Sequence, residues 1–376
     1  MSKIISFKFA AKKTKNKQLM SISSRKLLQH DAFIPLSSWR RFWAKFISIK
    51  SSIPTLILLF LFFILLIFSA LFYNQSPFKS INKAYALNFE LPSSLNPWKN
   101  IVLPQSDELN VFQQFAKLQP DAVKISRIID QKDGLQTFSV SYNAYLLFND
   151  TNIHLLGTNS NGVDIYSRMI YTIGYVCLIA IVSGVVSLTL STFLASFFAV
   201  YLNKQISKTI EKIFTTFALI PYLFISLILF LIFDINVVNA IVIFSTLSSI
   251  SLFINAYQKS IEILKNEYVN ANIATGFSKW DILTKTTLKP VFMSQLIQIV
   301  EQINIIFVCY SAISIFDINT TSLTIGTSIK ESLNLVGHNP YYLIIQTVLI
   351  STFVFSLKSI SFALNSAYIN ERGQDA

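Results

Sequence analysis

Long apolar runs separated by short polar segments dominate the chain. They cover residues 53–73, 170–202, 213–233, 237–257, 291–316 and 341–357. A helix that crosses a bilayer needs about 20 mostly apolar residues, so the pattern predicts six transmembrane helices and an all-α integral membrane protein. The composition agrees, because only 13% of the residues are charged and 52% are apolar, whereas soluble domains are about 25% charged.

The distribution of charge predicts how the chain is oriented. Residues 1–50 contain nine Lys and three Arg against Asp31 alone, so 12 − 1 = +11 of the formal net charge of +12 lies there. Cytoplasmic flanks of membrane spans carry an excess of Lys and Arg. We therefore expect a multi-pass protein of the cell membrane with both termini in the cytoplasm. The basic segment is interpreted as a topology signal that meets membrane lipids, not as a nucleic-acid site.

The spans and the charges divide the chain into five parts. We expect a basic cytoplasmic tail with an interfacial helix over 1–52 and the first transmembrane helix over 53–73. An extra external domain over 74–153 follows, then a core of five transmembrane helices over 154–366 and a cytoplasmic tail over 367–376. Within the external domain, residues 137–142 alternate apolar and polar positions and predict a strand.

An aromatic stripe precedes the first span. Trp39, Phe42, Trp43 and Phe46 recur at helical spacing, and the cations nearby lie mostly off that stripe. This pattern is typical of a helix in the membrane interface. An ordinary juxtamembrane anchor without a partner is the other interpretation.

The sequence offers no site for chemistry. Gly157 and Gly162 have the spacing of a phosphate-binding loop, but Val163 and Asp164 follow where that loop needs Lys and Ser or Thr. The two Cys and three His are scattered and predict no metal site. We expect no catalytic residue, no cofactor, no metal and no ATPase site, so another chain must supply the energy if transport is ATP-driven.

The segment 258–290, expected in the cytoplasm, carries the strongest motif. Residues 267–275 predict a short helix that Gly276 ends, and Trp280 begins a second amphipathic turn. Pro290 is expected to let the chain turn into the next span. A helix–turn–helix between two spans suits a docking element, and a plain connecting loop is the alternative.

The fifth apolar run contains a polar stripe. Ser294, Gln295, Gln298, Glu301 and Gln302 fall within about 120° of a helical wheel. Intramembrane acids usually face protein or a water-filled cavity. The stripe is interpreted either as the lining of a translocation pathway or as polar contacts between packed helices.

Three motifs resemble a known family. The Glu-Tyr-Val-x-Ala-x-x-Ala-x-Gly pattern over 267–276, with Pro290 at the next helix start, looks like the "EAA" loop of ABC importer permeases. Residues 154–171 are similar to the "LGTDxxGRDxxSRxxxG" signature of the dipeptide/oligopeptide branch. Residues 38–43 resemble the start of the OppC-like subunit of that branch.

The resemblance implies a function and its residues. Such a permease imports oligopeptides together with a second homologous permease, two ABC ATPase subunits and an extracellular peptide-binding protein. The residues expected to dock an ATPase are Glu267, Tyr268, Asn270, Ala271, Ala274, Gly276 and Pro290. The residues that match the signature, expected to be structural, are Gly157, Thr158, Gly162, Asp164 and Arg168.

Other functions compete with this one. A self-contained, ion-coupled secondary transporter would also have six spans and an intramembrane acid, but it would give no reason for the loop motif. An ABC permease for nickel or another small solute would share every motif. An integral-membrane enzyme or a scaffold for the external domain fits less well, because neither explains the segment 258–290.

Overall fold

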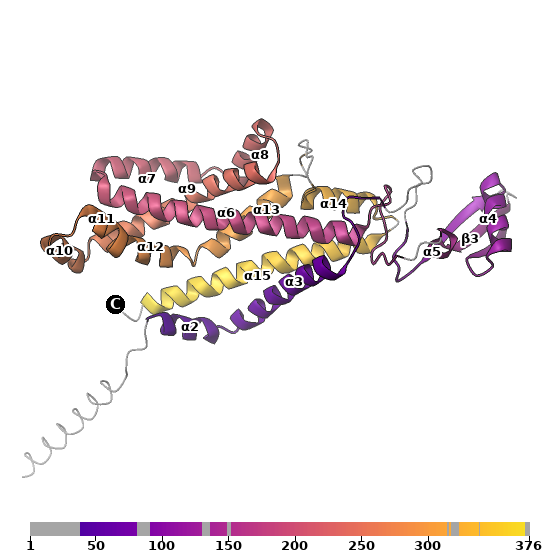
Figure 1. Cartoon of the computed structure of the whole chain (residues 1–376), viewed down its shortest axis with the longest axis horizontal. Helices are drawn as coiled ribbons and strands as arrows, with labels where there is room; N and C mark the ends of the chain where they lie inside the picture. Colours follow the sequence, from indigo (N-terminus) through magenta and orange to yellow (C-terminus); the bar gives the residue numbers. More distant parts are fainter. Residues whose placement is uncertain are drawn as a thin grey trace, which may run out of the picture. The chain divides into compact units, whose positions relative to one another are not determined.

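The computed structural model describes residues 38–80, 91–129, 136–148, 152–313, 316, 323–337 and 339–372 (Figure 1). The chain divides into two compact units, one of residues 1–50 with 366–376 and the other of residues 51–365. In the first unit, α2 (Ser38–Ser48) buries Phe42 and Phe46 and exposes Trp43 and Ile47. The helix predicted there is confirmed, and its place in the membrane interface stays a prediction.

Four of the predicted spans are single long helices. These are α3 (Ser52–Phe72), α6 (Ile165–Tyr201), α9 (Val237–Leu264) and α15 (Pro340–Arg372). Each is long and apolar enough to cross a membrane, in α15 over Pro340–Tyr368. The apolar pattern located all four, although α9 and α15 continue beyond the ends of the runs 237–257 and 341–357.

Each of the other two predicted spans is a pair of helices with a bend between them. In place of 213–233 the chain forms α7 (Lys204–Ala218) and α8 (Tyr222–Ile232), inclined at 86°. Pro221 separates them, because proline has no N–H and disfavours helix in the residue before it. In place of 291–316, α12 (Leu288–Gln295) and α13 (Ile299–Ile313) meet at 52°. The described chain therefore has four spans, or six if each bent pair counts as one.

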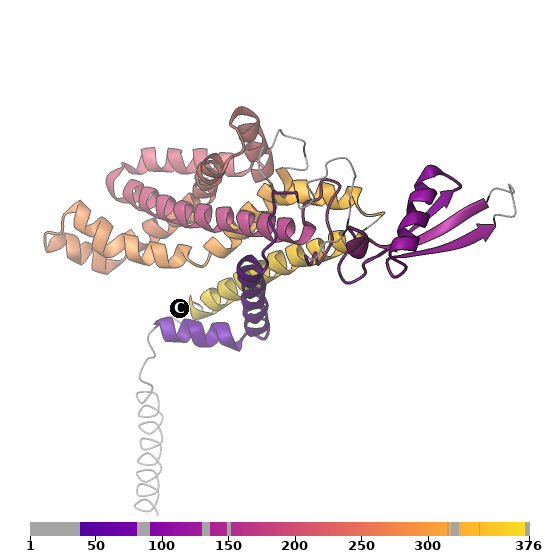
Figure 2. The same ribbon diagram turned by 45° about the vertical axis from the view of Figure 1, so that its right-hand side comes forward.

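Helix α6 is the centre of the bundle. It contacts α3, α9, α12, α13 and α14 (Ile325–Asn334), as the two ribbon views show (Figures 1 and 2). Small buried residues on α6, such as Ser183 and Gly184, allow neighbouring helices to come close. A Cβ at Gly184 would lie 2.7 Å from the Ile303 side chain on α13. Close packing on α6 thus holds α9 and α13 in place.

A small sheet interrupts the helices between α3 and α6. The strands β1 (Trp98–Pro104), β2 (Val123–Ile129) and β3 (Gln136–Asn143) are antiparallel in the order β1-β3-β2. Helix α4 (Asp107–Leu118) contributes Leu109 to a core with Val123 and Val140, and α5 (Ala144–Phe148) follows β3. The strand expected at 137–142 is confirmed. The all-α description needs this correction, because a segment with period-two alternation can bury one face of a sheet.

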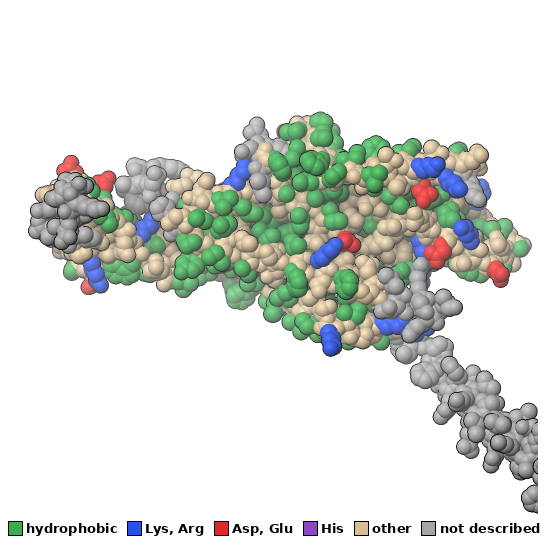
Figure 3. Space-filling model, turned by 180° about the vertical axis from the view of Figure 1, so that it is seen from behind, with side chains coloured by type: hydrophobic (Ala, Val, Ile, Leu, Met, Phe, Trp, Pro, Cys, Tyr) green, Lys and Arg blue, Asp and Glu red, His purple; other side chains and the backbone are tan. Residues whose placement is uncertain are grey.

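Hydrophobic side chains cover much of the middle of the face seen in Figure 3, whereas most of its charged side chains lie toward the two ends. Exposed apolar residues are numerous on the predicted spans; examples are Phe60, Leu71, Leu178, Phe224 and Phe362. A soluble protein rarely exposes large contiguous apolar patches. The surface is that of a protein surrounded by lipid.

Candidate functional site

The loop between α9 and α12 presents a short exposed helix. This is α10 (Glu267–Ala274), which begins after Asn266 and has Glu267 in its first turn. Tyr268, Asn270, Ala271 and Ala274 are all exposed. The helix expected at 267–275 is confirmed to within a residue, and its expected docking residues share an accessible surface.

Gly276 ends α10 in the expected conformation. Its φ is +93°, in the left-handed region that favours glycine. The Gly276 N–H donates to the Ile273 carbonyl at 3.0 Å, and the Phe277 N–H donates to the Asn272 carbonyl at 3.1 Å. These two bonds form a Schellman motif. A Cβ at Gly276 would meet nothing within 4 Å, so the backbone conformation alone selects glycine.

The second part of the loop returns to the membrane as a continuous helix. Helix α11 (Lys279–Asp281) passes into a π-helix (Ile282–Thr287) and then into α12. Ser278 caps α11, and its carboxylate partner Asp281 also pairs with Lys285 at 2.6 Å. Hydrogen bonds from Lys285 and Ser278 lower the pKa of Asp281. This fixed start orients the helix that leads to α13.

Pro290 does not turn the chain, which corrects the expectation for this residue. It lies in the first turn of α12, where the missing N–H is tolerated because the π-helix before it changes the bonding pattern. The Leu288 N–H donates to the Leu283 carbonyl, five residues earlier. The bend into α13 comes later, where the Gln298 N–H donates to the Gln295 carbonyl at 2.9 Å.

A single buried residue anchors α10. Val269 packs in a cluster that includes Ile263 of α9, Ile282 of the π-helix and Val291 of α12. The cluster also contains Ala195 of α6. Val269 thus connects α10 to a cluster shared with α9, the π-helix and α12, and movement of α10 would be passed to the bundle through this cluster.

The polar residues predicted on one arc of the fifth span do not share one environment. The Asn255 side chain on α9 donates to Gln298 Oε1 at 2.8 Å. Gln302 accepts from Ser248 at 3.1 Å and donates to Ser251 at 3.5 Å. Gln302 of α13 and Gln298, directly before α13, thus both bond to α9, as the packing interpretation expects.

Glu301 faces another helix. Its Oε1 lies 2.5 Å from Lys358 Nζ of α15, and the two side chains keep 36% and 64% of their surface exposed. Gln295 is buried, and its Oε1 has no hydrogen-bond partner. The expected single stripe is thus divided among three surroundings, because the bend after Gln295 changes the direction of the helix.

A cavity of about 560 Å³ lies where α7 and α8 meet. Residues of α8, α9 and α13 contribute to its lining, among them Tyr222, Ser251 and Gln302. Gln302 is the only one of the four expected pathway residues that borders this cavity. The cavity is a space where a solute could meet uncharged hydrogen-bonding groups.

The signature before α6 forms a compact turn. Gly157 and Gly162 have φ of +79° and +71°. A Cβ at Gly157 would lie 2.2 Å from the Leu91 carbonyl oxygen. Thr158 bonds the same segment, since its Oγ1 accepts from the Leu91 N–H at 2.8 Å. Glycine is required here so that the Leu91–Pro92 segment, which leads toward β1, can pass directly over the turn.

Asp164 caps α6 and joins it to the end of α3. Its Oδ1 accepts from the Ser167 N–H at 2.7 Å, which satisfies one of the free donors of the helix. Its Oδ2 accepts from the Tyr73 hydroxyl at 2.8 Å and lies 2.8 Å from His154 Nδ1. Asp164 and His154 are fully buried.

Arg168 extends these contacts to α14. Its Nε lies 2.9 Å from Glu331 Oε2, and Asn159 Nδ2 donates to Glu331 Oε1. No sequence pattern indicated Glu331, Tyr73 or Lys358 as partners. Their roles depend on contacts between residues far apart in the chain, which no local pattern reveals.

Comparison with known families identifies the class. Residues 191–369, just under half of the chain, match the family described as "binding-protein-dependent transport system inner membrane component". Over this range the chain is similar to the permease components of binding-protein-dependent ABC transport systems. Such a component lacks an ATPase site, and its class implies ATPase and binding-protein partners.

No curated protein matches the chain significantly. The family match begins within α6 and includes α10, the π-helix and α13. It disfavours the alternative of a self-contained secondary transporter. The family description names no substrate.

Proposed function

We propose that this permease component serves an ATP-driven importer of oligopeptides. It would assemble with a second homologous permease, two ABC ATPase subunits and an extracellular peptide-binding protein. The observation that carries the proposal is α10, an exposed helix ended by a Schellman motif and held by one buried residue, Val269. The class match supports it, since an importer permease needs a surface on which separate ATPases can act.

Contacts in the loop support docking on 258–290. Tyr268, Ile273, Phe277 and Trp280 are exposed apolar or aromatic side chains on a short helical element outside the long apolar runs. Aromatic residues are enriched in the centres of protein interfaces. An ATPase groove would cover these residues and leave the polar ends of the loop at the rim.

The Val269 cluster supports a route from ATPase to membrane. A push on α10 acts on Val269, and thereby on α9 and α12. Helix α12 leads through the break that contains Gln298 into α13, which carries Gln302. ATPase closure would in this way change the contacts between α9 and α13.

The chemistry near the α7–α8 bend supports a peptide as cargo. Gln302 and Ser251 line the cavity there, and Tyr222 adds a hydroxyl. Amide and hydroxyl groups both donate and accept, as the backbone of a peptide also does. The signature 154–171, which resembles the peptide branch, supports the same cargo.

Uptake by the reconstituted complex tests the proposal. The chain, purified with its co-expressed partners, is placed in liposomes with ATP inside or outside, and entry of a labelled pentapeptide and of Ni²⁺ is measured. ATP-dependent peptide uptake supports the proposal. Uptake of Ni²⁺ without peptide would assign the permease to the metal-transporting alternative, and transport by the chain alone without ATP would contradict the dependence on separate ATPases.

A further inference from the structure

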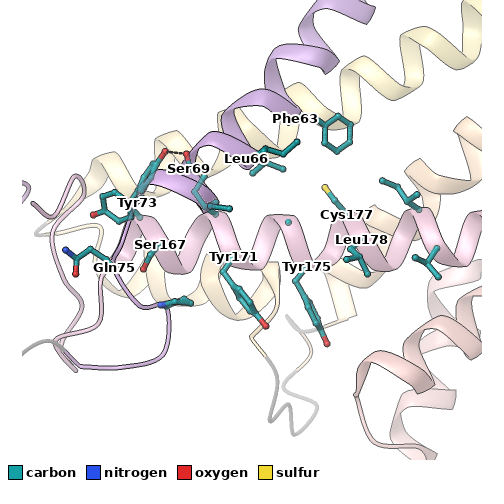
Figure 4. Close-up of a pocket in the computed structure, with 18 residues that line it drawn as sticks. Phe63, Leu66, Ser69, Tyr73, Gln75, Ser167, Tyr171, Tyr175, Cys177 and Leu178 are labelled. Atoms are coloured by element: carbon teal, nitrogen blue, oxygen red, sulfur yellow. Dashed lines mark hydrogen bonds between the residues drawn. The ribbon is translucent and has the colours of Figure 1, made fainter.

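A second cavity lies on the side of the bundle, between α3 and α6. Its volume is about 670 Å³, and it lies apart from α7 to α13. Figure 4 shows the two helices close together near Ser69 and separating toward Phe63 and Cys177. No part of the transport mechanism above uses this cavity.

The walls of the cavity are apolar and open to the surroundings of the bundle. Ile67 of α3 and Leu178 of α6 line it, yet each is more than half exposed, at 58% and 56%. Among the residues that the structure describes, no Lys, Arg, Asp, Glu or His contributes to its lining. Both walls belong to helices that are long and apolar enough to cross a membrane, so the medium that meets this cavity is lipid.

Polar groups gather at one end. The Ser69 and Tyr166 hydroxyls lie 2.6 Å apart and satisfy each other. Tyr73 and Gln75 line the same end, just after α3 finishes. Tyrosine is enriched where membrane spans meet the headgroup layer. The cavity thus has an apolar length and a polar end, which matches the chemistry of a phospholipid.

The cavity is long and apolar. The lining of α6 runs from Tyr166 to Val182, about 24 Å at 1.5 Å per residue. A groove of this length, open to the membrane along its side, suits an extended acyl chain.

We propose that the groove between α3 and α6 binds one acyl chain of a membrane phospholipid, with the headgroup beside Tyr73 and Gln75. The absence of a side chain at Gly174 leaves room for the acyl chain in the groove. Gly174 lines the groove, and a Cβ built there meets nothing within 4 Å. A large side chain at this position would project into the place of the lipid.

Photolabelling of the assembled complex tests this proposal. The complex is reconstituted with a phosphatidylethanolamine that carries a diazirine in one acyl chain, and labelled residues are mapped by mass spectrometry. Label is expected within 63–78 and 166–182, falling about tenfold in Gly174→Trp. Gly174→Ala should retain it, and so should Val185→Trp, which adds the same ring to an exposed site on α6 outside the groove.

Two results would overturn the proposal. Equal labelling of all exposed positions on α3 and α6, unchanged in Gly174→Trp, would mean that only surrounding bulk lipid is present. A cross-link between these residues and a second polypeptide would mean that protein covers the groove. If Gly174→Trp fails to assemble, Ile67→Trp on the opposite wall gives the same test, because Ile67 is largely exposed.

Discussion

Arg168 and Glu331 are far apart in the chain, yet Arg168 Nε lies 2.9 Å from Glu331 Oε2. The first residue belongs to the start of α6 and the second to α14. Their side chains are only 22% and 18% exposed. The pair therefore joins two segments in a partly buried place, where leaving one charge alone is costly.

Removing one partner should destabilise the protein. Glu331→Gln is expected to lower the free energy of unfolding by about 1–3 kcal/mol, since Arg168 loses its counter-charge in a partly buried place. Thermal unfolding of the detergent-solubilised chain measures this. Lys330→Gln, one residue away on α14, is the control. No change in Glu331→Gln relative to that control would show that the pair adds no stability.

Gly157→Ala should be more harmful than Gly174→Ala. A methyl group at 157 would meet the Leu91 carbonyl oxygen at 2.2 Å in a backbone with φ of +79°. We expect a loss of about 1–3 kcal/mol. At 174, where no atom lies within 4 Å, alanine in a helix interior should add up to about 1 kcal/mol. Equal melting temperatures for the two variants would contradict this difference.

Gly276→Val should weaken the attachment of ATPase subunits. A β-branched residue cannot readily keep a φ of +93°, so the Schellman motif and the position of Phe277 would change. Co-purification of ATPases with the tagged chain is expected to fall about tenfold, whereas Thr275→Ala should retain them. The melting temperature should hardly differ, because Gly276 is exposed. Full ATPase recovery with Gly276→Val would contradict docking at this loop.

Glu301 and Lys358 call for a double-mutant cycle. We expect Glu301→Leu to reduce peptide uptake in an assembled complex, since it leaves Lys358 without its partner at 2.5 Å. If the pair serves the translocation pathway, the double variant Glu301→Leu with Lys358→Leu should stay inactive while it recovers stability. Restored uptake in the double variant would instead assign the pair to helix packing.

The sequence predicted what depends on local pattern. Runs of apolar residues located α3, α6, α9 and α15, and Glu267 to Gly276 predicted α10 with its glycine end. Pro221 itself is a local signal for the bend between α7 and α8. The continuous apolar run 213–233 nevertheless led us to predict a single span there. The break after Gln295 contains no glycine or proline, so the sequence could not predict it.

The parts that could not be predicted are contacts at a distance. Glu301 shares a helical arc with Gln298 and Gln302 in an ideal helix, but the structure turns it toward Lys358 of α15. The signature around Asp164 was expected to be structural. The hydrogen bond from the Tyr73 hydroxyl to Asp164 suggests how, because it links the end of α3 to the start of α6. Such pairings depend on which helices become neighbours.

The sheet domain enters and leaves the permease at nearly the same point. The Ser94 N–H donates to the His154 carbonyl at 2.9 Å, and the Ser94 hydroxyl donates to the same oxygen. Because the two ends of this segment are hydrogen-bonded to each other, its length does not change the distance between the helices that it connects. The region between them can lengthen, shorten or be exchanged during evolution while the helices on either side keep their register. The insertion is in this sense a removable module, and an engineer could replace it with a tag or a sensor domain.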